Sequence, residues 1–136
     1  MGGKSKTAFG LHFKVKFVNM NKVNYQKILE QTIEKNERRN CVPTLLLHSC
    51  CAPCSSYCLE YLSNYFKITV FYYNPNIYPE EEYHKRVAEQ RKFIEKLPVK
   101  YPIHFVEGAY EKERFYEMAK GLEDCPEGGE RCFLCY

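Results

Sequence analysis

Three short runs of apolar and β-branched residues, separated by segments with helical periodicity, decide the fold class of this chain. The runs cover residues 43–48, 67–73 and 101–106, and the first contains three leucines in succession. A short continuous apolar run is typical of a strand that is buried on both faces of a sheet. Strands that alternate with helices of this length indicate crossover units and parallel pairing. The sequence therefore predicts an α/β fold with a parallel sheet.

Helix signals lie on both sides of these runs. Asn24 is a candidate N-cap, because the apolar residues after it recur on one helical face. Ser55 or Ser56 is expected to cap the helix after the first strand. Pro79, followed by three glutamates, marks the start of a charged helix. A further helix is expected over residues 111–120.

Eight cysteines, most of them clustered, are the main chemical feature of the sequence. Four lie within nine positions and three within eleven, while Cys41 stands apart. We see no export signal, so we expect a reducing compartment, where clustered cysteines serve metal or redox chemistry rather than disulfides. Cys41 and Cys58 are expected to be buried apolar side chains, since free cysteine is often buried.

The spacing of the remaining cysteines favours a shared metal centre. Two thiolates from Cys132-x-x-Cys135 suit zinc and iron–sulfur sites equally, whereas the adjacent Cys50 and Cys51 suit separate irons of a cluster better than one tetrahedral zinc. Both pairs are expected just before helices, whose N-termini favour the thiolate. Because ligands bind beyond the carboxyl ends of parallel strands, we expect one site at that edge.

Charge is distributed unevenly along the chain. The first 29 residues carry six lysines and no acidic residue, although the net charge is only +3. Such an arm suits a polyanion such as RNA, or it is an ordinary solvated tail. We predict a basic arm over residues 1–23 and an α/β domain over 24–136. No apolar run approaches 18 residues, so we expect no membrane partner and a cytoplasmic protein.

Three strings of the sequence resemble epoxyqueuosine reductases of the QueH type. They are LHSCCAPCS at residues 47–55, YNPNIYPEEEY at 73–83, and the segment from GLEDCPEGGE to the CxxC-Tyr end at 121–136. The resemblance implies a Rossmann-like parallel sheet with flanking helices, the three-layer sandwich of the adenine nucleotide hydrolases. Sequences of this type continue past the last motif, so the resemblance also implies that this fold is incomplete here, truncated at its C-terminal end.

The resemblance further implies an activity and a cofactor. Proteins of this type are oxidoreductases that remove the epoxide oxygen of epoxyqueuosine in the tRNA anticodon loop, with electrons from an external donor. The implied cofactor is a 4Fe-4S cluster held by Cys50, Cys51, Cys132 and Cys135. An additional iron beside the cluster is implied as well, and Cys54 is its expected contact.

Other residues have less specific expectations. The sequence assigns no catalytic residue, but His48 is a candidate proton donor at the end of the first strand. Asn74, Asn76 and Tyr83 are expected to contact the substrate. One alternative is a zinc- or cluster-stabilised RNA-binding module without catalysis, and others are an inactive shortened paralogue or a thioredoxin-like dithiol catalyst. The sequence leaves the oligomeric state and the electron donor open.

Overall fold

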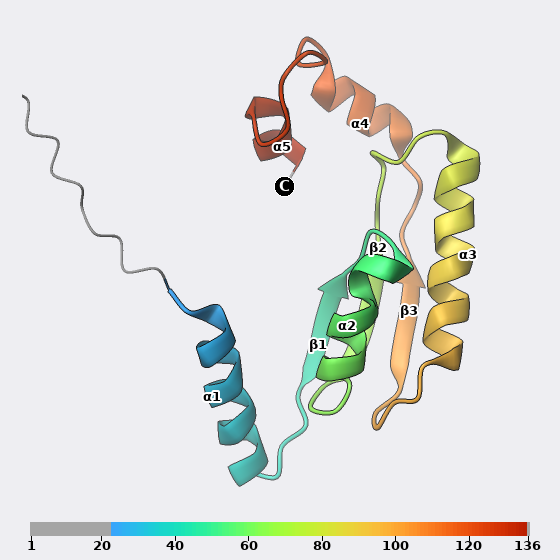
Figure 1. Ribbon diagram of the computed structural model, residues 1–136. Coiled ribbons are helices and arrows are strands. Elements are labelled where there is room, and N and C mark those ends of the chain that lie inside the picture. Colours follow the sequence, from blue (N-terminus) through green and yellow to red (C-terminus); the bar gives the residue numbers. More distant parts are fainter. Residues whose placement is uncertain (1–22, 136) are drawn as a thin grey trace, which may run out of the picture.

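A computed structural model describes residues 23–135 of the chain and contains, within them, three parallel strands and five helices (Figure 1). The strands are β1 (Thr44–His48), β2 (Lys67–Tyr72) and β3 (Ile103–Glu107). The helices are α1 (Tyr25–Arg38), α2 (Ala52–Leu62), α3 (Glu80–Lys96), α4 (Lys112–Ala119) and α5 (Glu130–Cys135). The predicted α/β fold with a Rossmann-like parallel sheet is confirmed. The predicted basic arm lies outside the described residues except for Val23, so its boundary stays a prediction.

The sheet has the order β1-β2-β3, so each strand pairs with the next one along the chain. Leu46 lies opposite Thr69, and Val70 lies opposite Phe105. Helices α2 and α3 form the two connections between these strands, as parallel pairing requires. All three carboxyl ends therefore lie at one edge of the sheet, and α4 and α5 lie beyond that edge (Figure 1).

The core lies between β2 and the helices. Ile68 and Val70, which alternate along β2, pack with Leu59 of α2, and all three side chains are fully buried. Ile33 of α1 joins the same cluster. Burial of one such side chain contributes about 1.5–3 kcal/mol of transfer free energy, so this helix-covered face carries most of the stability of the sheet.

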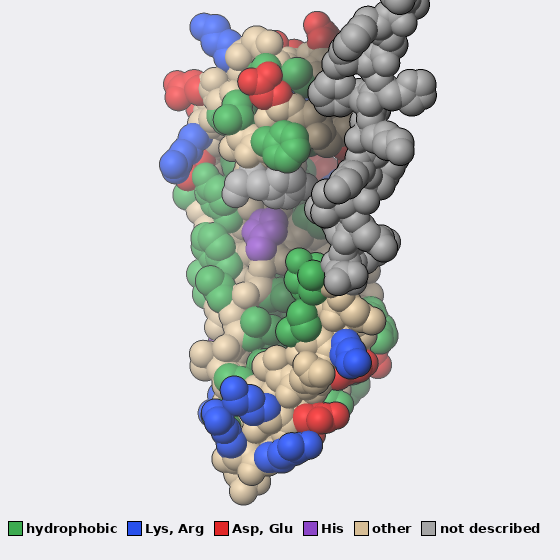
Figure 2. All heavy atoms as spheres, turned by 90° about the vertical axis from the view of Figure 1, so that its left-hand side faces the viewer, with side chains coloured by type: hydrophobic (Ala, Val, Ile, Leu, Met, Phe, Trp, Pro, Cys, Tyr) green, Lys and Arg blue, Asp and Glu red, His purple; other side chains and the backbone are tan. Residues whose placement is uncertain are grey.

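The opposite face of the sheet is open within residues 23–135. Leu46 of β1 is 71% exposed and Val106 of β3 is 47% exposed. Seen from the β1 side, hydrophobic side chains form a band between charged groups at the two ends (Figure 2). The prediction that the first strand is buried on both faces is therefore wrong here, because the helices that contact the core pack on one face only. Two layers of the implied three-layer sandwich are present among the described residues.

The helix starts were predicted with mixed success. The side chain of Asn24 accepts a hydrogen bond from the backbone N–H of Lys27 at 3.0 Å, which confirms the first cap. Helix α2 begins at Ala52, with Cys51 at the N-cap position, so the prediction of a serine cap is wrong. Pro53 is the physical reason, because its fixed φ suits the first turn and lets the helix begin before the serines.

The one-sided core predicts unequal costs for two leucine substitutions. Leu59→Ala should lower the free energy of unfolding by about 2–5 kcal/mol, because it opens a cavity among buried side chains. Leu46→Ala, the matched control on the open face, should change it by less than about 0.5 kcal/mol. Urea denaturation of the purified chain measures both values. Equal losses for the two variants would contradict a core confined to one face.

Candidate metal centre at the carboxyl edge of the sheet

Three cysteine side chains converge in the turn between β1 and α2. The sulfur atoms of Cys50, Cys51 and Cys54 all lie within 4.8 Å of one another. The sulfurs of the first two are 3.9 Å apart. Local structure explains the convergence, since Cys51 is the N-cap of α2 and Cys54 follows within its first turn. The thiols therefore gather where β1 ends, at the edge where parallel sheets bind ligands.

The electrostatics of this cluster favour one thiolate. The hydrogen bond with Cys54 lowers the pKa of Cys51, and the nearby charge of Arg86 lowers it slightly further. The same bond raises the pKa of Cys54 to about 11, because that thiol serves as the donor. The hydrogen bond, the Arg86 charge and the position of Cys51 at a helix N-terminus therefore all favour its thiolate form.

Buried side chains at the end of β2 and just after it hold the backbone of the cysteine turn. The Tyr72 hydroxyl donates to the carbonyl oxygen of Cys50 at 3.0 Å. Burial raises the pKa of Tyr72 to about 12, so this hydroxyl keeps its proton over the physiological range. The amide nitrogen of Asn74 donates to the carbonyl oxygen of Ser49 at 2.8 Å. Asn74 is buried and supports the turn, which leaves it almost no surface for a substrate to contact.

His48 and Tyr73 connect the strand ends to α4. The ring nitrogen Nε2 of His48 donates to the carbonyl oxygen of Tyr73 at 2.9 Å, because a carbonyl can only accept. The Tyr73 hydroxyl in turn donates to Glu111, the N-cap residue of α4, at 2.8 Å. His48 is exposed. These bonds hold the start of α4 beside the end of β2.

Cys132 and Cys135 lie in α5, so the prediction that this pair precedes a helix is wrong. The sulfur of Cys132 accepts a hydrogen bond from the backbone N–H of Gly128 at 3.3 Å. Gly128 has a φ of +78°, which suits glycine in the turn before α5. Cys135 lines a cleft of ≈ 440 Å³ together with Tyr73 and Phe71. The group of three convergent sulfurs does not include either residue of this pair.

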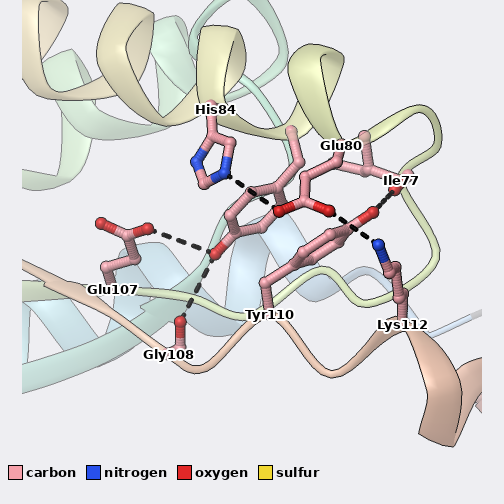
Figure 3. Close-up of polar contacts among 8 residues, drawn as sticks. Ile77, Glu80, His84, Glu107, Gly108, Tyr110 and Lys112 are labelled. Carbon is pink, nitrogen blue, oxygen red and sulfur yellow. Dashed lines mark hydrogen bonds and ion pairs between the residues drawn. The ribbon is translucent and has the colours of Figure 1, made fainter.

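The other predicted substrate contacts have different environments. Asn76 is exposed in the turn after β2. Tyr83 is 1% exposed, and its ring stacks on that of Tyr110 with the centroids 4.2 Å apart. Its hydroxyl lies 3.5 Å from a carboxylate oxygen of Glu107 and 3.4 Å from the carbonyl oxygen of Gly108 (Figure 3). Tyr83 is thus part of the core that joins α3 to the end of β3.

The isolated cysteines differ from expectation. Cys41 and Cys58 are both exposed, so the prediction that they are buried is wrong. The buried positions of α2 are Ala52, Ser55 and Leu59. The buried face is therefore shifted by one residue from the face that contains Cys58. Leu59 faces the core instead of Cys58, because burial of the larger apolar side chain of leucine is more stabilising.

Sequence reasoning missed Gln90, which the structure places behind the cysteine turn. Its side chain is fully buried and bonded to Ser49 and Ser55. A signal was available, because Gln90 continues the inward-facing spacing of Tyr83 and Val87 along α3. A polar residue on an otherwise apolar stripe indicates a specific hydrogen-bonding partner.

The fold and this edge together define an α/β protein with a candidate thiolate metal centre. The description of the matching family model is Epoxyqueuosine reductase QueH, and the match covers residues 45–136. The chain belongs to the epoxyqueuosine reductase QueH family.

Curated relatives support the same assignment, and each of those below is named Epoxyqueuosine reductase QueH. The relative from Streptococcus pyogenes is 39% identical over 123 residues, which cover 87% of this chain and 48% of the relative. The relative from Staphylococcus epidermidis is 44% identical over 119 residues, covering 85% and 50%. The Staphylococcus aureus relative is 42% identical with the same coverage. The chain therefore spans about half the length of these curated relatives.

Among the described residues, none of the helices has the length and apolar character needed to cross a membrane.

The donor set of the cysteine turn has a clear preference among metals. Thiolates are soft ligands that select zinc, Cu(I) and iron–sulfur clusters over hard cations such as Mg²⁺. Three sulfurs within 4.8 Å fit such a metal centre, so Cys50, Cys51 and Cys54 could hold one.

Cobalt titration tests this triad directly. Cys54→Ser should weaken Co²⁺ binding by at least the roughly 10- to 100-fold typical of an outer-shell partner, since it removes a direct ligand. The charge-transfer absorption from thiolate to cobalt should fall as well. Cys58→Ser is the matched control, because Cys58 is exposed on the same helix but outside the triad. Equal binding by both variants would rule out Cys54 as a ligand.

Proposed function

We propose that this chain forms part of an epoxyqueuosine reductase, an oxidoreductase of queuosine biosynthesis and tRNA processing that removes the epoxide oxygen of epoxyqueuosine in the tRNA anticodon loop. The observation that carries the proposal is the convergence of Cys50, Cys51 and Cys54 at the carboxyl edge of the sheet in a chain of this family. Removal of the oxygen as water takes two electrons and two protons. A redox metal centre, reduced by an external donor, would supply these electrons.

The proposed cofactor is a 4Fe-4S cluster with Cys50, Cys51, Cys132 and Cys135 as ligands. The backbone N–H bond to the Cys132 sulfur supports this, because such bonds stabilise thiolate ligands and tune cluster potentials. An additional iron is proposed beside Cys54, the third member of the triad. The centre would supply electrons one at a time and polarise the epoxide oxygen. Such a centre requires reduced thiols, which fits the proposed cytoplasmic location.

The cleft that Cys135 lines offers a surface for the modified base. The rings of Phe71 and Tyr73 stack with an interplanar angle of 6° and line the cleft that contains Cys135. Aromatic rings of this kind stack the unpaired bases of single-stranded RNA. Asn76, exposed in the turn after β2, is the remaining polar candidate for substrate contact. His48, hydrogen-bonded to the Tyr73 carbonyl, is the proposed proton donor.

A zinc-stabilised RNA-binding module is the second candidate function. The same three sulfurs would also suit zinc, and the lysine-rich first 29 residues suit a polyanion. Elemental analysis after anaerobic purification separates the two. Iron with acid-labile sulfide supports the reductase, whereas stoichiometric zinc without iron supports the module.

Iron content tests the proposed ligands. Cys51→Ser and Cys132→Ser should each remove most of the iron bound after anaerobic reconstitution, because each would delete one cluster ligand. Cys41→Ser is the control, since Cys41 is exposed and lies outside the proposed centre. Iron retention in all three variants at the level of the unchanged chain would contradict the ligand assignment.

Activity is measured on tRNA that carries epoxyqueuosine. The iron-loaded protein, supplied with a chemical reductant, should convert the modified nucleoside to queuosine, and mass spectrometry of digested tRNA measures the product. Asn76→Ala should raise KM more than it lowers kcat, because the amide is proposed to contact substrate and not the reacting bond. Full iron loading without any conversion would overturn the proposed reaction.

A further inference from the structure

Gln90 lies behind the cysteine turn and is completely buried on α3. Its side-chain oxygen Oε1 accepts a hydrogen bond from the Ser49 hydroxyl at 2.9 Å. The same oxygen accepts a second bond from the Ser55 hydroxyl at 3.1 Å. One atom therefore joins the residue before the cysteine pair to the first turn of α2.

The two serines extend this connection to the backbone of the cysteine turn. The hydroxyl oxygen of Ser55 lies 3.1 Å from the carbonyl oxygen of Cys51. The hydroxyl of Ser49 lies 3.4 Å from the same carbonyl. Each hydroxyl has a single proton, which it divides between the Gln90 oxygen and the Cys51 carbonyl, so the two serines link these two acceptors in one network. Gln90 is the member of this network that comes from a separate element of the fold.

The amide nitrogen of Gln90 indicates that this side chain has a specific role. Among the described residues, its nitrogen Nε2 is buried without a hydrogen-bond partner. An unpaired buried donor destabilises a protein, and a leucine at this position would fill similar space without it. What glutamine adds is the acceptor oxygen between Ser49 and Ser55. Gln90 therefore contributes by fixing the geometry of the turn, and not by burying apolar surface.

We propose that Gln90 is a positioning residue for the metal centre. It fixes the cysteine turn against α2, so that the sulfurs of Cys50, Cys51 and Cys54 converge before a metal binds. A ligand set that is ordered in advance loses less conformational entropy on binding, which raises its affinity. The inference rests on the proposed function in one respect, namely that this triad holds a metal.

Cobalt binding and hydrogen exchange of the reduced, metal-free chain test the proposal. Gln90→Leu should weaken Co²⁺ binding by about 10- to 100-fold, the range found when outer-shell partners are removed. Backbone amides of residues 49–55 should also exchange faster, because the turn loses its connection to α3. Gln90→Glu keeps an acceptor oxygen and should bind Co²⁺ more tightly than Gln90→Leu.

Ser63→Ala is the matched control. The Ser63 side chain is also buried, but its hydroxyl bonds to the carbonyl of Glu60 at the far end of α2. This variant should keep the Co²⁺ affinity and the exchange rates of residues 49–55. Should Gln90→Leu fail to fold, Ser55→Ala removes one bond of the network and is expected to weaken Co²⁺ binding severalfold.

The outcomes separate this inference from the proposed function. Unchanged Co²⁺ affinity and unchanged exchange in Gln90→Leu would overturn the positioning role. Absence of Co²⁺ binding by the unchanged chain would overturn the metal centre instead. In that case faster exchange of residues 49–55 in Gln90→Leu would still support control of the turn by Gln90. Unchanged exchange would overturn the positioning role as well as the metal centre.

Discussion

The structure of the site depends on the pairing of backbone carbonyl groups in the short turn between β1 and α2. Buried carbonyls must be hydrogen-bonded, and this turn is too short to pair them internally. Tyr72 and Asn74 supply the donors for Cys50 and Ser49. They can do so only because β2 runs parallel to β1 and ends beside it. The sheet topology is therefore a condition for the convergence of the thiols.

A second set of contacts brings the C-terminal helices to the same edge. His48 bonds to the Tyr73 carbonyl, and the Tyr73 hydroxyl bonds to Glu111 at the start of α4. An exposed ion pair between Lys112 and Glu80, 2.7 Å apart, adds a contact between α4 and α3 (Figure 3). Because α5 follows α4, both helices lie beyond the carboxyl ends of the strands, at the same edge of the sheet as the cysteine turn. This arrangement fits a site assembled from distant parts of the chain.

Sequence reasoning predicted the elements better than their environments. Alternating apolar runs and capping residues identify strands and helices because those signals are local. The exposure of Leu46 was not predictable, since the same apolar run suits either one or two covered faces. The helical phase of α2 was misjudged at Cys58 because Ser55 is buried by its bond to Gln90, a contact 35 residues away. Adjacent cysteines indicated a candidate metal centre, but the hydrogen bonds that shape the cysteine turn come from other elements.

The closeness of the three sulfurs also has a chemical consequence in air. A thiolate at Cys51 is the form that peroxide attacks, and a sulfenic acid formed there would lie beside two further thiols. Condensation with either one would give a disulfide and remove two donors at once. Occupancy by a metal would block this route, because bound sulfurs are shielded from oxidants. A metal held by these sulfurs and a disulfide formed from them would therefore exclude each other.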